Sequence, residues 1–223
     1  MNVLTILRSV EELLYEVISW LLFYPRTLWM TLTCPLETMY YSDQEQRDKP
    51  EKQYLETLSP PLFLVLSILL AHSLELALGF KVEHGTSEIG RLVTENEQGL
   101  LAFRALLFSL YAVIYAALAL RLTGKRLDRE SLRTPFFAQC YLSGAYAILI
   151  SIGSTCIRYP NAWGVGSGSL IILLTTVWYI AVEIAWFRRE CAGHPFVATL
   201  TALGGFALGA AISLSISAIV VLG

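Results

Sequence analysis

Residues 196–222, FVATLTALGGFALGAAISLSISAIVVL, contain no charged side chain, and this run decides the class of protein. An α-helix needs about 20 mostly apolar residues to cross the hydrocarbon core of a bilayer. Four further runs have that length and character, and they cover residues 61–80, 99–122, 136–157 and 169–187. The sequence therefore predicts an all-α membrane protein with five transmembrane helices, joined by short loops.

The composition of the whole chain supports this prediction. Of its 223 residues, 55% are hydrophobic and only 15% are charged, whereas about a quarter of the residues in soluble domains are charged. The net charge of -2 lacks the basic excess of a nucleic-acid-binding protein, so we expect no nucleic-acid partner. The four cysteines show no CxxC and no Cys/His metal spacing. We therefore expect no metal site and no cofactor.

Residues 1–32 form an amphipathic region of a different kind. Over 3–23 the apolar residues recur at spacings of three and four, which predicts an amphipathic helix that ends at Tyr24-Pro25. A second short amphipathic piece is expected around 26–32. Aromatic rings of the kind found at the membrane surface gather here, at Trp20, Phe23, Tyr24 and Trp29. The helix is expected to lie in the interface of the lipid bilayer, or to pack on the bundle or on a partner protein. Its acidic polar face argues against attraction to anionic lipid.

Residues 33–59 are polar and carry charges of both signs, which predicts a cytoplasmic linker or a surface helix. Ser59-Pro60-Pro61 then opens the transmembrane domain, residues 60–223. With five spans, one side of the membrane holds twelve basic residues: Arg8, Arg26, Arg47, Lys49, Lys52, Arg121, Lys125, Arg126, Arg129, Arg133, Arg188 and Arg189. The other side holds Lys81, Arg91 and Arg158. Because basic loops stay in the cytoplasm, we expect an inner-membrane protein with a cytoplasmic N-terminus and a C-terminus outside.

The sequence offers little for catalysis. No Asp lies within a predicted span, and HExxH is absent. The run GVGSGS at 164–169 is similar to a serine nucleophile elbow, but Val165 stands where the first Gly is required. We expect a flexible turn there instead, and no catalytic residues.

Polar and ionisable groups within membrane spans are rare and are by default functional candidates. The sequence places five of them in the predicted spans: His72, Glu75, Arg104, Gln139 and Glu183. They could line a proton relay or a permeation path, or they could pair structurally inside the bundle. Glu75 and Arg104 lie at matched depths in consecutive spans, which predicts an ion pair. The alternatives are that Arg104 extends toward the headgroups and that His72 pairs with Glu75.

The last span contains the GxxxG motif Gly205–Gly209. Small residues at this spacing let helix backbones approach closely. The motif predicts helix packing within the chain, with the seam of a homo-oligomer as the alternative.

The stretch Tyr24-Pro25-Arg26-Thr27-Leu28-Trp29, leading to Leu58-Ser59-Pro60-Pro61-Leu62-Phe63 and five closely spaced helices, resembles the Yip1-type membrane family and small bacterial proteins labelled permeases. The resemblance implies a non-enzymatic helper in membrane or envelope processes. We therefore expect a scaffold or accessory protein whose N-terminal region contacts a partner or the interface. The alternative is a small transporter or channel, in one copy or as an oligomer, with the intramembrane ionisable residues along its path.

Overall fold

The computed structural model describes residues 3–49, 52–80, 88–159, 161–190 and 195–222. These residues form α-helices, with no β-strand in the ranges described. In chain order the helices are α1 (Val3–Thr33), α2 (Pro35–Glu45), α3 (Pro60–Ala77), α4 (Glu88–Thr94), α5 (Glu97–Leu122), α6 (Arg129–Ile157), α7 (Ala162–Glu190) and α8 (Pro195–Leu222).

Five of these helices, α3, α5, α6, α7 and α8, are long and apolar enough to cross a membrane. The predicted class is therefore confirmed: the chain is an all-α, multi-pass membrane protein preceded by an amphipathic helical region. Two spans begin earlier than the sequence predicted. α6 begins at 129 rather than 136, and α7 begins at 162 rather than 169.

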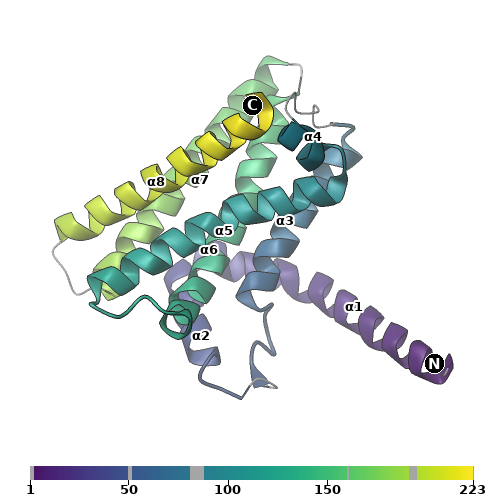
Figure 1. Cartoon of the computed structure of the whole chain (residues 1–223), viewed down its shortest axis with the longest axis horizontal. Coiled ribbons are helices and arrows are strands. Elements are labelled where there is room, and N and C mark those ends of the chain that lie inside the picture. The colour runs from purple at the N-terminus through teal and green to yellow at the C-terminus, as the bar shows by residue number, and fades with distance from the viewer. Residues whose placement is uncertain (1–2, 50–51, 81–87, 160, 191–194, 223) are drawn as a thin grey trace.

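α6 is the central helix of the bundle, because it packs against α3, α5 and α7. In its most apolar stretch 61% of the residues are buried within the protein, against 17% for α8. α8 lies along α5 and α7 on the outside of the bundle (Figure 1). We call the end of the bundle that holds α1, α2 and the starts of α3 and α6 the α1 end. The opposite end, which holds the last turn of α3 and the start of α5, is the far end.

Glycines set the close approach of α6 to α7. A Cβ atom added at Gly168 would lie 2.5 Å from the carbonyl oxygen of Gly153, so only hydrogen fits between the two backbones. Gly164, Gly166 and Gly168 all lie within α7, so the flexible turn predicted at 164–169 is wrong. Gly164 and Gly168 serve helix packing, because small residues let two helix backbones come together.

Gly205 and Gly209 of α8 face α5 in the same manner. A Cβ atom at Gly205 would lie 2.7 Å from the ring of Tyr115, and one at Gly209 would lie 2.7 Å from the ring of Tyr111. The GxxxG motif therefore seats two tyrosine rings within the chain, as the packing alternative predicts. These tyrosines belong to an aromatic core, in which the Tyr146 and Tyr179 rings lie 4.5 Å apart.

α1 continues through Pro25 to Thr33, so the predicted end at Tyr24-Pro25 is wrong. Proline in a helix interior removes one hydrogen bond and costs about 3 kcal/mol. Tertiary contacts next to the proline offset that cost. The Tyr24 hydroxyl donates to Ser67 Oγ at 3.0 Å, the Tyr24 ring stacks on Phe63 at 5.3 Å, and the Leu58 amide donates to Thr27 Oγ1 at 3.1 Å.

Residues 33–59 form more than a solvated linker. Within them α2 packs against α6 and α7, and its Thr38, Met39 and Ser42 side chains are buried. The Tyr41 and Tyr54 rings, 6.4 Å apart, join α2 to the following segment. Two of the three buried side chains of α2, Thr38 and Ser42, are polar, so a polar sequence here does not indicate a solvated linker.

Candidate functional site

The far end of the bundle contains a buried ion pair. Arg104 Nη2 of α5 donates to Glu75 Oε2 of α3 at 2.7 Å, and the exposed fractions of these side chains are 19% and 6%. This is the pair that the matched depths of the two residues predict. An unpaired charge at this depth costs a few kcal/mol on insertion scales, so the pair stabilises the insertion of both helices.

His72 extends the pair into a network of four residues. Its Nε2 lies 2.5 Å from Glu97 Oε2, and its Nδ1 lies 3.9 Å from Glu75 Oε2. The Glu97 side chain is 63% exposed, whereas the other three members are largely enclosed. The sequence analysis missed Glu97, because it precedes the apolar run of the second span. Its position seven residues before Arg104, on the same face of α5, is the signal that could have found it.

A second polar cluster lies between α6 and α7. Gln139 Nε2 donates to Glu183 Oε2 at 3.1 Å, and both side chains are fully buried. Tyr179 and Ser143 lie within reach of this pair, one helical turn from Glu183 and Gln139 respectively. Four oxygens of the cluster have no hydrogen-bond partner among the described residues: Gln139 Oε1, Glu183 Oε1, Ser143 Oγ and Tyr179 OH.

The two clusters lie far apart along the bundle. Gly144 of α6 packs against the Leu64 backbone of α3, which fixes the relative level of these helices. Glu75 lies eleven residues beyond Leu64, and Gln139 lies five residues to the other side of Gly144. At about 1.5 Å per residue, these sixteen residues separate the clusters by roughly 24 Å. The aromatic core, with Tyr111, Tyr146 and Tyr179, belongs to the interior between them.

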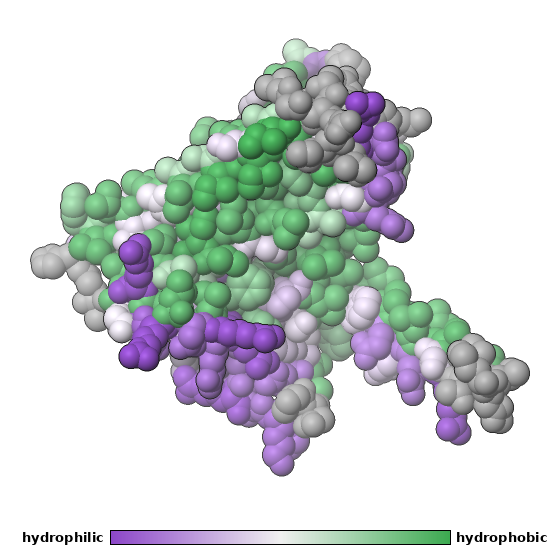
Figure 2. All heavy atoms as spheres, in the orientation of Figure 1, coloured by the Kyte–Doolittle hydropathy of each residue, from purple (hydrophilic) through white to green (hydrophobic). Residues whose placement is uncertain are grey.

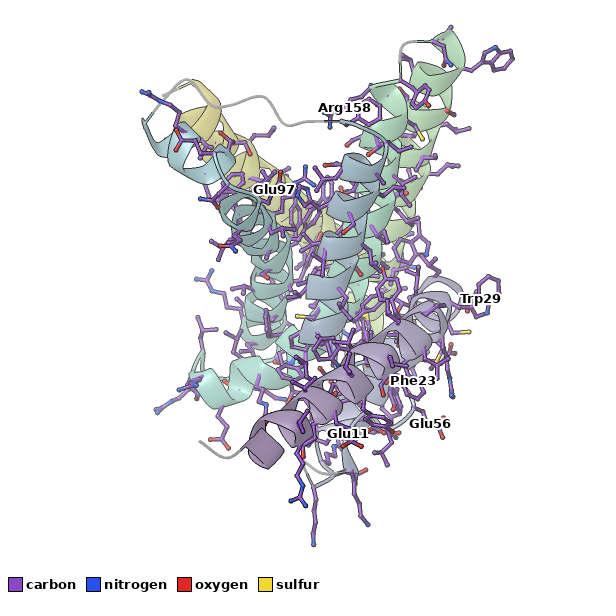
Figure 3. The ribbon with its side chains drawn as sticks, turned by 90° about the vertical axis from the view of Figure 1, so that its right-hand side faces the viewer. Glu11, Phe23, Trp29, Glu56, Glu97 and Arg158 are labelled. Carbon is purple, nitrogen blue, oxygen red and sulfur yellow. The ribbon has the colours of Figure 1, made fainter. Side chains whose placement is uncertain are left out.

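The remaining candidate is α1 itself. It leaves the α1 end of the bundle and projects away from it (Figure 1), and it crosses that end below the spans in Figure 3. Tyr24, Thr27 and Thr31 are buried against the bundle. The apolar side chains that precede them are exposed, among them Leu7, Val10, Leu13, Leu14, Val17, Ile18, Leu21 and Leu22.

The two faces of α1 point in different directions. Figure 2 shows its apolar face turned toward the level of the apolar bundle, and its polar face turned the other way. The polar face points to the same side as the charged surface below the spans in that view. This arrangement matches an amphipathic helix in the plane of a membrane interface.

Comparison with protein-family models, with curated proteins and with solved structures gives no match for this chain. Within the described ranges, no group of three or more His, Cys, Asp and Glu side chains could hold a metal ion.

Proposed function

We propose that this chain is a non-enzymatic scaffold or accessory protein of the inner membrane. In this proposal the five spans anchor the protein, and α1 lies along the cytoplasmic interface, where it presents a polar face to partner proteins. The observation that carries the proposal is the uncovered apolar stripe of α1, whose C-terminal part is held on the bundle by Tyr24 and Thr27.

A membrane interface is the environment that suits this stripe best. Exposed apolar patches of more than a few hundred Å² are rare on soluble surfaces, and the α1 stripe continues over several helical turns. Its acidic polar face, with Glu11, Glu12 and Glu16, remains available to a partner. Trp29, which is 69% exposed, is suited to the headgroup level at the bundle edge.

The orientation belongs to the same proposal. Basic residues gather at the α1 end, on the loop before α6 and at the end of α7, whereas the described part of the far end carries Arg91, Arg104 and Arg158. The positive-inside rule then puts the α1 end in the cytoplasm. A reporter that is active only outside the cytoplasm should be active when fused after Gly223. Inactivity there, with activity for a fusion near Lys125, would contradict this orientation.

A transporter or channel is the second candidate function. Its support is the set of buried polar atoms without partners in the Gln139–Glu183 cluster and beside Glu75. The separation of roughly 24 Å between the clusters, together with the aromatic core, disfavours a continuous polar path. Solute and ion flux in proteoliposomes distinguishes the two functions: no flux above that of empty liposomes is expected, and flux that Glu183→Gln abolishes would favour the transporter.

The resemblance to the Yip1-type family remains part of the proposal at the level of architecture. In this proposal the chain and the family share a cytoplasmic N-terminal segment that precedes five closely spaced helices. The scaffold role predicts that protein partners contact one face of α1 and lipid contacts the other.

Photo-crosslinking tests that prediction directly. A crosslinker in place of Glu12, on the polar face, should give discrete protein adducts in intact membranes. The matched crosslinker in place of Leu14, on the apolar face, should give lipid adducts. Protein adducts at neither position, or equal protein adducts at both, would contradict the proposed role of α1.

A further inference from the structure

The start of α6 borders a cavity that the proposed function does not use. The cavity has a volume of about 670 Å³ and is lined by Arg129, Glu130, Leu132, Arg133, Phe136 and Phe137. This volume lies in the range of small-molecule binding sites. It is located at the α1 end, at the first turns of a membrane-spanning helix.

The mouth of this cavity is basic. Arg129 and Arg133 are four residues apart on α6, so their side chains share one face of the helix. Both are exposed, and neither forms an ion pair with a carboxylate in the described ranges. Glu130 is the acidic member of the lining, so the lining side chains carry one net positive charge. Guanidinium groups bind phosphate oxygens through two parallel hydrogen bonds.

The floor of the cavity is apolar. Leu132, Phe136 and Phe137 line it, and the Arg133 guanidinium lies 5.3 Å from the centroid of the Phe137 ring. Phe137 also lines a second cavity, of about 470 Å³. The apolar part of that second lining comes from α1 and from the segment before and within α3, namely Trp20, Phe23, Leu55, Leu58 and Leu62. Phe137 therefore lines both cavities, and the second lining also contains polar side chains: Glu16, Ser19, Gln53, Thr57 and Ser59.

We infer that the cavity at the start of α6 binds one anionic phospholipid, with Arg129 and Arg133 donating to its phosphate and an acyl chain lying along Phe136 and Phe137. A basic pocket beside transmembrane helices at the headgroup level has the chemistry that anionic lipids require. A free anion would leave the apolar floor uncovered, whereas a zwitterionic lipid lacks the net charge. Glu16 of α1 lines the second cavity, where it accepts a hydrogen bond from the Trp20 indole at 3.1 Å. It does not line the first cavity, where Arg129 and Arg133 lie.

The test uses the full chain in detergent, with dioleoyl phosphatidylglycerol as the anionic lipid and dioleoyl phosphatidylcholine as the zwitterionic one. Retained lipid is counted by native mass spectrometry, and thermal stability is measured across each lipid titration. We expect phosphatidylglycerol to be retained at one copy per chain and to raise Tm above the value in phosphatidylcholine. Arg129→Gln with Arg133→Gln should weaken apparent phosphatidylglycerol binding by roughly thirty-fold.

The matched control is the double variant Arg121→Gln with Arg126→Gln. It removes the same charge from the same end, and neither residue lines the cavity. This control should retain the one tightly bound phosphatidylglycerol. If the Arg129→Gln, Arg133→Gln double variant does not fold, the two single variants are measured in its place. Equal loss in both double variants would show general surface attraction and overturn the inference. A Tm shift that inorganic phosphate reproduces, or no preference over phosphatidylcholine, would overturn it as well.

Discussion

Removal of one partner of the Glu75–Arg104 pair should destabilise the bundle measurably. Either change leaves a largely enclosed charge without its partner, since the two side chains are 6% and 19% exposed and their N–O distance is 2.7 Å. Breaking a fully buried pair in a soluble protein costs about 3–5 kcal/mol. Hydrogen bonds between membrane helices contribute less, about 0.6 kcal/mol on average and up to about 1.7.

We therefore expect Glu75→Gln and Arg104→Gln each to lower the free energy of unfolding by about 1–3 kcal/mol. The coupling energy from the double-mutant cycle should be about 1–2 kcal/mol, because the double variant contains neither charge and so leaves no buried charge without a partner. The cost for Arg104→Gln is the smaller one, since Glu75 keeps His72 nearby at 3.9 Å. Unfolding is followed by helicity in mixed micelles with increasing denaturing detergent.

Arg91→Gln is the matched control for this cycle. Arg91 lies on α4 near the same end of the bundle, and its side chain is exposed. Its removal should change the free energy of unfolding by less than about 0.5 kcal/mol. Strict additivity of Glu75→Gln and Arg104→Gln, or single effects no larger than that of Arg91→Gln, would show that the two side chains do not form a stabilising pair.

Three further outcomes follow from contacts elsewhere in the chain. Gly168→Ala should cost about 1–3 kcal/mol in detergent unfolding, because its Cβ would meet the Gly153 carbonyl; Gly166→Ala is the control, since a Cβ there meets no described atom within 4 Å. Backbone amides hold the pKa of the Asp128 carboxyl below its ordinary value, so its stabilisation of the first turn of α6 is complete above that ordinary value and is lost as pH falls through the folded pKa. The protection of the amides in that turn, taken relative to the intrinsic exchange rate at each pH, should fall in acid and in Asp128→Ala, but not in Asp128→Asn. Burial raises the pKa of Tyr54 to about 12. The difference between the ultraviolet titrations of the native chain and of Tyr54→Phe should therefore show one phenol that stays neutral until about that pH. A difference that titrates at about 10 in the native fold would contradict this prediction.

The sequence predicted the spans well because lipid-facing helices are apolar over their whole crossing length. It misplaced the starts of α6 and α7, because a helix continues beyond the hydrocarbon core into polar and glycine-rich sequence. The first turns of α6 contain Arg129 and Arg133, and those of α7 contain Gly164. A hydropathy pattern does not predict a helix in these turns, although the N-cap residue Asp128 marks where α6 begins.

The same limits apply to the candidate site. Glu75 and Arg104 could be paired from depth alone, because both lie inside apolar runs. Glu97 and Tyr179 were missed, since Glu97 precedes the apolar run and tyrosine is a residue type common in apolar cores. The path of α1 through Pro25 also depends on tertiary contacts, which local sequence rules for proline do not include.

The proposed function requires α1 to lie in the plane of the membrane interface, and a depth profile along α1 measures this. Single spin labels are placed at successive positions from 10 to 22 in a cysteine-free chain in lipid nanodiscs, and their accessibility to oxygen and to a water-soluble relaxant is measured. An in-plane helix predicts oscillation with the helical period of about 3.6 residues, with Leu14, Ile18 and Leu21 in lipid and Glu11 and Glu12 in water. Uniform access to the water-soluble relaxant at all positions would show that α1 does not lie in the interface.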